Sequence, residues 1–140
     1  MKISANFDVR ELVPPETWAT YKERSVKFTD KRIVNLLEAI RTLCGNKRVT
    51  ANNWHYGGKF RYRGYRPPEC SVGAAKSMHR VFQAVDFDVE GTTAEEVRGV
   101  IRLNQVELMK LGLRRMESSV SWVHIDTKET GLEKIKEFKP

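Results

Sequence analysis

The chain has 140 residues, 40% of them hydrophobic and 31% charged, with a formal net charge of +7. These values predict one globular domain over residues 1–140 and exclude a disordered chain. No apolar run reaches the roughly 18 residues of a transmembrane helix. No apolar stretch follows Lys2, so we expect no membrane span and no signal peptide, with synthesis in the cytoplasm.

Cysteine content and charge narrow the function only slightly. Cys44 and Cys70 have neither the spacing of a metal site nor that of a disulfide framework. This favours a cytoplasmic protein whose two thiols stay reduced. The positive charge favours contact with polyanions. Nucleic acid and anionic bacterial cell wall both meet that condition, so charge does not choose between them.

The first third of the chain predicts helices. Asp8 and Glu11 have the spacing of a capping box, and Pro14 ends the short helix that follows it. A second helical turn is expected from Pro15 to Lys22. The clearest helical pattern covers residues 30–44, where apolar residues recur at helical spacing before Gly45.

Strands are expected next, at residues 48–54 and 59–66. In the second segment basic and aromatic residues alternate, so a strand would place Lys59, Arg61 and Arg63 on one face. This pattern is typical of an edge strand with a solvated face, and also of a binder of single-stranded nucleic acid. We expect a loop at residues 72–75.

The second half predicts strands at residues 83–89, 113–118 and 121–127, a helix at 93–111 and a short terminal helix at 131–138. The predicted fold class is therefore α+β, a small antiparallel sheet with helices packed on one face. The other face would hold the functional cleft, with Trp122 as a wall because it shares a strand face with His124.

Three side chains could close on one metal ion. His79 lies seven residues before Asp86, and His124 lies on the last predicted strand. Two imidazoles and one carboxylate leave a fourth position open, which is the ligand set of a catalytic zinc site. Taken singly, each histidine could instead be an ordinary core or surface residue.

These residues also resemble a known family. The segment from Ser77 to Asp86 resembles the SxHxxGxAxD motif of zinc D-alanyl-D-alanine carboxypeptidases, matching it at Ser77, His79, Ala84 and Asp86. The family includes phage endolysins and shares its fold with the hedgehog signalling domain. The sequence Val-His-Ile-Asp at 123–126 resembles the family's last-ligand strand. The sequence Gly-Tyr-Arg-Pro-Pro at 64–68 resembles the segment upstream of the histidine motif. The resemblance covers residues 3–128, with the motif-bearing core at about 30–128.

The resemblance implies a zinc peptidase, encoded by a phage or prophage, that cuts the stem peptides of bacterial peptidoglycan after release from the cell. His79, Asp86 and His124 would hold Zn²⁺, and Arg66 would hold a substrate carboxylate through its planar fork. The alternative for Arg66 is a structural salt bridge. The expected partner is peptidoglycan peptide rather than membrane or nucleic acid, and the expected state is a monomer.

Two positions depart from the family pattern. Phe82 replaces a glycine, so it would force another local backbone path or fill part of the cleft. Ser121 stands where many members carry an acidic general base. The candidates to replace that base are Glu117, Asp126 and Asp88, although Asp126 could instead orient a metal ligand. These departures leave open a second hypothesis: a catalytically inactive, zinc-holding domain that binds cell wall or belongs to a virion.

Overall fold

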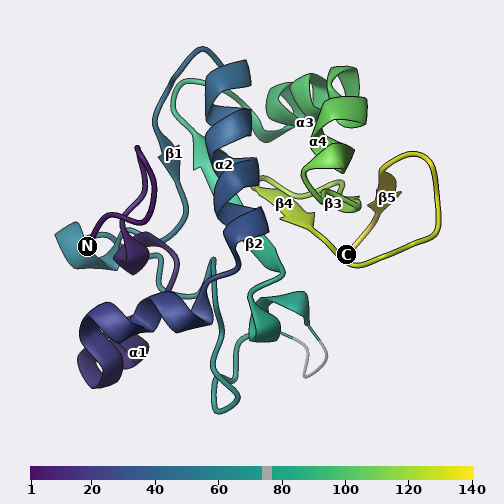
Figure 1. Ribbon diagram of the computed structural model, residues 1–140. Helices are drawn as coiled ribbons and strands as arrows, with labels where there is room; N and C mark the ends of the chain where they lie inside the picture. Colours follow the sequence, from purple (N-terminus) through teal and green to yellow (C-terminus); the bar gives the residue numbers. More distant parts are fainter. Residues whose placement is uncertain (74–76) are drawn as a thin grey trace.

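The computed structural model describes residues 1–73 and 77–140, which form an α+β fold built on one five-stranded sheet (Figure 1). The expected α+β class is thus confirmed. Within the described residues the α-helices are α1 (Pro15–Tyr21), α2 (Lys31–Leu43), α3 (Ala94–Leu103) and α4 (Gln105–Lys110). Short 3-10 helices cover Val9–Glu11, Lys22–Phe28, Trp54–Tyr56 and Met78–Val81.

The sheet has the strand order β1-β2-β4-β3-β5. Its strands are β1 (Val49–Thr50), β2 (Ala84–Val89), β3 (Arg115–Glu117), β4 (Val123–Asp126) and β5 (Lys136–Phe138). The first three pairings in this order are antiparallel, but β5 runs parallel to β3. The prediction of a purely antiparallel sheet was therefore wrong at this edge.

The hydrophobic core lies between the sheet and the helices. Helix α2 packs on β2, and α3 packs on both β2 and β4 (Figure 1). Side chains alternate along a strand, and one face of the three central strands belongs to the core: Val85, Phe87, Met116, Val123 and Ile125 are all fully buried. The residues between them therefore point to the opposite face of the sheet.

Capping residues begin the helices as their side-chain chemistry predicts. Asp8 and Glu11 form the expected capping box around the 3-10 helix Val9–Glu11. Asp30 accepts a hydrogen bond from the Arg32 backbone at the start of α2. Thr93 and Glu96 form a second capping box at α3. The expected helix at 93–111 is interrupted at Asn104, which ends α3 and begins α4.

Two predicted elements are absent from the described chain. Residues 59–66 form no strand, because their backbone N–H groups bond elsewhere: Phe60 donates to the Asn53 side chain, Arg63 to that of Asn52 and Tyr65 to the Leu12 carbonyl. Residues 131–138 form no helix, and they end instead in β5. Residues 74–75 of the expected loop lie outside the described residues.

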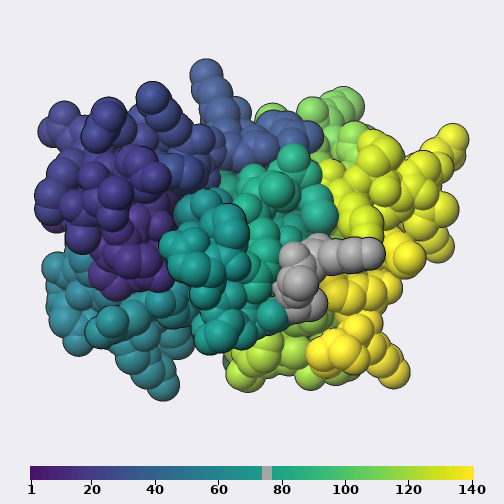
Figure 2. Space-filling model, turned by 90° about the horizontal axis from the view of Figure 1, so that it is seen from below, coloured from purple at the N-terminus to yellow at the C-terminus, as the bar shows by residue number. Residues whose placement is uncertain are grey.

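The two ends of the chain flank the region that leads into β2. Seen from below, residues near the N-terminus (purple) and those near the C-terminus (yellow) lie on opposite sides of the teal region (Figure 2). In the described part of the chain, no helix is both long enough and apolar enough to span a bilayer.

Candidate metal centre

The strand register brings four side chains into one row on the face opposite the core. Asp86 of β2 is paired with His124 of β4, His124 with Glu117 of β3, and Glu117 with Phe138 of β5. Residues paired in this way share a face of the sheet. The row therefore joins two predicted metal ligands, a predicted general base and an aromatic residue that the sequence did not indicate.

His79 reaches the same place from the 3-10 helix Met78–Val81. The Ser77 hydroxyl accepts a hydrogen bond from the His79 backbone N–H and caps this helix. The imidazole Nδ1–H donates to the Gly64 carbonyl at 2.9 Å. This bond fixes the tautomer and leaves Nε2, which lies 3.4 Å from Asp86 Oδ1, free to bind a metal.

His79, Asp86 and His124 offer ligand atoms that all lie within 4.8 Å of one another. Their side chains are only 3%, 11% and 12% exposed. Two imidazole nitrogens and a carboxylate oxygen form a donor set suited to zinc and to other divalent transition metals. The cluster therefore fits a metal ion, as the sequence predicted, and its donor set alone does not identify the metal.

Without a metal ion, hydrogen bonds and ion pairs hold the cluster together. Burial lowers the pKa of His124, but hydrogen bonds to Asp126 and Asp86 outweigh burial and raise that pKa to about 9. Burial raises the pKa of Asp86, yet bonds with His124 and His79 leave it well below its usual range. His124 is thus an imidazolium at neutral pH, with Nδ1 2.7 Å from Asp86 and Nε2 3.0 Å from Asp126.

Asp126 lies behind His124 and not in the cleft. Its carboxylate is fully buried and accepts two hydrogen bonds from Arg115, at 2.9 Å from Nε and 2.8 Å from Nη2. Burial raises the pKa of Asp126, but its bonds to His124 and Arg115 lower it overall. These contacts make Asp126 a positioning group for the His124 ring, which is the alternative that the sequence left open.

Arg66 also touches the cluster. Its Nη2 lies 3.3 Å from Asp86 Oδ2, and its Nε donates to the Tyr62 carbonyl at 2.8 Å. Burial lowers the pKa of Arg66, although the Asp86 charge opposes this effect. The salt bridge foreseen for Arg66 is therefore present, and the guanidinium also lines the cleft.

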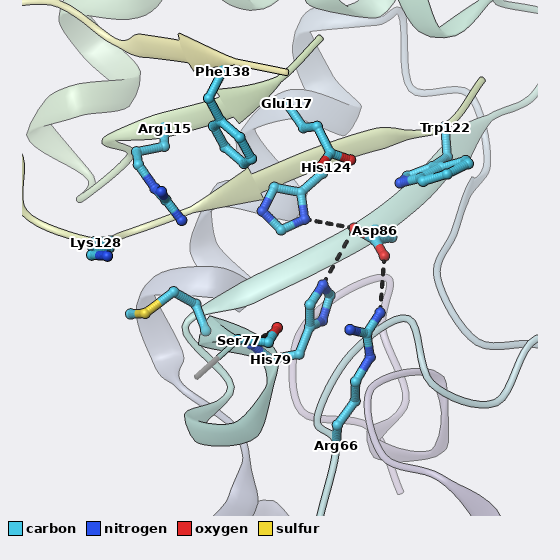
Figure 3. Close-up of a pocket in the computed structure, with 11 residues that line it drawn as sticks. Arg66, Ser77, His79, Asp86, Arg115, Glu117, Trp122, His124, Lys128 and Phe138 are labelled. Carbon is cyan, nitrogen blue, oxygen red and sulfur yellow. Dashed lines mark hydrogen bonds and ion pairs between the residues drawn. The ribbon is translucent and has the colours of Figure 1, made fainter. Parts of the chain in front are cut away.

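A cleft of about 340 Å³ opens over the cluster (Figure 3). The other predicted site residues that line it are Glu117 and Trp122, so Trp122 is a cleft wall as expected. The Glu117 carboxylate has no hydrogen bond or ion pair with any described residue. It is therefore the cleft carboxylate that remains available to accept a proton.

The remaining candidates for the general base lie elsewhere. Ser121 and Asp88 line a different hollow, next to the start of α3. Asp88 is also engaged, since Arg63 Nη1 lies 2.7 Å from its Oδ2. Of the acidic candidates named from the sequence, Glu117 is the one that lines the cleft.

Phe82 stands where the motif has a glycine, and its own backbone conformation accommodates the larger side chain. It adopts the left-handed conformation itself, with φ 48° and ψ 40°, at the end of the 3-10 helix Met78–Val81. Its side chain is 1% exposed and belongs to the hydrophobic core. The expectation that the ring fills part of the cleft was therefore wrong, and the left-handed backbone is one that glycine also adopts readily.

The basic residues of segment 59–66 do not line one face of a strand, as had been expected. The Arg63 guanidinium stacks on the Phe60 ring at 3.6 Å and pairs with Asp88. Arg66 points into the cleft. Without a strand, the alternation that suggested a nucleic-acid surface is not realised.

Four cleft residues were missed by sequence reasoning: Met78, Arg115, Lys128 and Phe138. Arg115 alternates with Met116 and shares a strand face with Glu117, so that signal was present in the sequence. Lys128 lies two residues after the end of β4, and Phe138 lies in a three-residue strand whose sequence has no recognisable period.

Fold and cluster together define a small α+β protein with a buried His-Asp-His group able to hold a metal ion. No protein-family model matches the chain, and no curated protein and no solved structure matched it in the searches.

Proposed function

We propose that this protein is a zinc-dependent peptidase that hydrolyses peptide bonds in the stem peptides of bacterial peptidoglycan. One observation carries the proposal: the Glu117 carboxylate, which no described residue pairs with, lines the same cleft as the His79–Asp86–His124 group. A metallopeptidase needs this combination of open-sided metal ligands and a nearby base. The motif resemblance supplies the substrate class.

His79 Nε2, one Asp86 oxygen and His124 Nδ1 would hold the ion. Zinc bound there would supply Lewis acidity, which makes water nucleophilic near neutral pH and polarises a peptide carbonyl. Gly64 and Asp126 keep both imidazoles oriented through the nitrogens that face away from Asp86. For zinc to bind, His124 must lose the Nδ1 proton that it shares with Asp86. Its Nε2–H would keep donating a hydrogen bond to Asp126.

Glu117 is proposed to accept the proton of the attacking water and to deliver it to the leaving amine. Arg66 is proposed to bind a substrate carboxylate with the part of its fork that Asp86 and Tyr62 do not use. Trp122 supplies an apolar wall that shields the reacting groups from bulk water.

The test is hydrolysis of purified peptidoglycan and of synthetic stem peptides by the zinc-loaded protein, read by mass spectrometry. We expect cleavage that a chelator abolishes and zinc restores, that His124→Ala eliminates, and that Glu117→Gln slows by about 10²–10⁴-fold. Asp88→Asn is the matched control, because Asp88 lies outside the cleft. Cleavage that survives both the chelator and His124→Ala would refute the proposal.

A second candidate is a zinc-holding domain that binds cell wall without cutting it. The observation that favours it is Ser121, which replaces the family's usual base and does not line the cleft. This candidate predicts zinc-dependent sedimentation with intact peptidoglycan and no new termini. Turnover lost in His79→Ala would exclude it.

A further inference from the structure

The cleft has cationic groups on two sides of the metal cluster. Arg66 approaches from one side, next to Asp86 (Figure 3). Arg115 and Lys128 lie on another side, beyond the His124 ring, with Phe138 above them (Figure 3). We call the group of Arg115, Lys128 and Phe138 the Lys128 subsite.

The members of the Lys128 subsite come from three neighbouring strands: Arg115 from β3, Lys128 from the chain after β4, and Phe138 from β5. The Lys128 backbone N–H donates to Asp126 Oδ1, which fixes the chain just after β4. The Arg115 guanidinium lies 4.5 Å from the centre of the Phe138 ring, and that ring meets the His124 ring edge-on at 5.6 Å. The subsite is thus continuous with the metal cluster.

Within this subsite, Lys128 is the cation that a ligand could use, because Arg115 is engaged by Asp126 through Nε and Nη2. The Lys128 ammonium has neither a hydrogen bond nor an ion pair with the residues that the structure describes. It lines the cleft all the same.

The charge balance of the cleft favours an anionic ligand. With His124 neutral, as metal binding requires, its lining holds three cations (Arg66, Arg115 and Lys128) and two carboxylates (Asp86 and Glu117). A divalent metal ion would add two further positive charges. The excess of positive charge in the cleft is therefore one without the metal and three with it, and such an excess attracts ligands of negative charge.

We propose that the Lys128 subsite binds a second carboxylate of an acidic peptide, separate from the carboxylate assigned to Arg66. The inference rests on the proposed function, which provides a peptide spanning the cleft. The preferred substrate is then a peptide with a carboxylate on each side of the scissile bond, and a peptide amidated on the Lys128 side is a poor one.

The experiment compares two synthetic stem peptides that differ only in one side-chain group, the free carboxylate of a D-glutamyl residue or its carboxamide. Binding to the zinc-loaded Glu117→Gln variant is measured by calorimetry, so that turnover does not interfere. We expect the carboxylate peptide to bind about 3- to 10-fold tighter at low salt, as for a charge-assisted contact at a partly open site. In Glu117→Gln combined with Lys128→Met, the preference should fall to about one.

The matched control is Lys134→Met, also made in Glu117→Gln. It removes the same charge from an exposed lysine that does not line the cleft, so it should leave the preference intact. Equal binding of both peptides, or a preference that persists in Lys128→Met, would overturn the inference. A preference that only Lys128→Met abolishes supports it.

Two further results would distinguish failure of the proposed peptidase activity from failure of the Lys128 subsite. If the carboxylate peptide binds through Lys128 but the zinc-loaded wild-type protein never cleaves it, the subsite stands and the peptidase activity does not. If wild type and Lys128→Met cleave both peptides with equal kcat/KM, the activity stands and the subsite falls.

Discussion

At the scale of single residues, Arg115 acts on the metal centre without touching it. It holds the buried Asp126 carboxylate, which in turn holds His124. We expect Arg115→Met to weaken zinc binding by about 10- to 100-fold, as is typical when a group that orients a ligand is lost. Competition with a chelating dye measures this. Arg102→Met, which breaks only surface ion pairs with Glu95 and Glu137, is the control, and equal affinity in both variants would contradict the argument.

Phe82 combines an unfavourable backbone conformation with a favourable side-chain position. Phe82→Gly should relieve about 1 kcal/mol of left-handed strain, but it removes a buried ring worth about 3–5 kcal/mol. We therefore expect a net loss of roughly 2–4 kcal/mol, measured by urea unfolding. A variant more stable than wild type would show that backbone strain dominates.

The three residues that could hold a metal ion were predictable because each is placed by a short-range pattern. Strand alternation puts Asp86 and His124 on one face, and Ser77 marks the start of the 3-10 helix that carries His79. The role of Asp126 was not predictable. It depends on Arg115, which lies on a neighbouring strand, and no local pattern specifies which strands become neighbours.

At the scale of elements, β5 forms the cleft wall that carries Phe138. The Lys136 N–H donates to the Arg114 carbonyl, so Lys136→Pro removes a bond of the sheet. We expect this change to detach β5 and weaken peptide binding several-fold while zinc binding is kept. Lys134→Pro is the control, since no hydrogen bond from its backbone N–H is present in the described structure. Equal peptide affinity in the two variants would argue against a role for β5.

The long helices and central strands followed from the sequence because their periodicity is sustained. Helix α2 and strand β2 agree with prediction within two residues at each end. The predictions for segments 59–66 and 131–138 failed for one reason: long-range contacts decide the structure of both. Asn52, Asn53 and Leu12 satisfy the first segment's backbone, and pairing with β3 fixes the end of the second.

At the scale of the whole molecule, the metal-free protein should lose stability as pH rises. The pKa of His124 in the fold is about 9, above the unfolded value of 6.5, so its contribution is complete below pH 6.5 and disappears as pH passes about 9. The loss amounts to about 3 kcal/mol at most. Denaturant unfolding in chelator at pH 6 and pH 9 measures it. His124→Gln should show a flatter dependence, and an equal slope would contradict the assignment.

Zinc should reverse this trend, because it requires a deprotonated His124. At a zinc concentration of about 100 times Kd, binding should add about 2.7 kcal/mol of stability. For a chain of this size, that raises Tm by about 9 °C. Thermal scans should show a larger rise at pH 8 than at pH 6, and none in His124→Ala.

Gly64 joins the N-terminal segment to the metal centre. A Cβ at this position would lie 2.2 Å from the Leu12 carbonyl oxygen, too close for any side chain. The Gly64 carbonyl also accepts the His79 Nδ1–H, and the next residue, Tyr65, donates to the Leu12 carbonyl. A random mutagenesis screen for variants that retain their fold but no longer hold zinc should therefore recover Gly64 together with the ligands. Such a screen would show a loss of zinc binding at a glycine, which has no side chain to offer a metal.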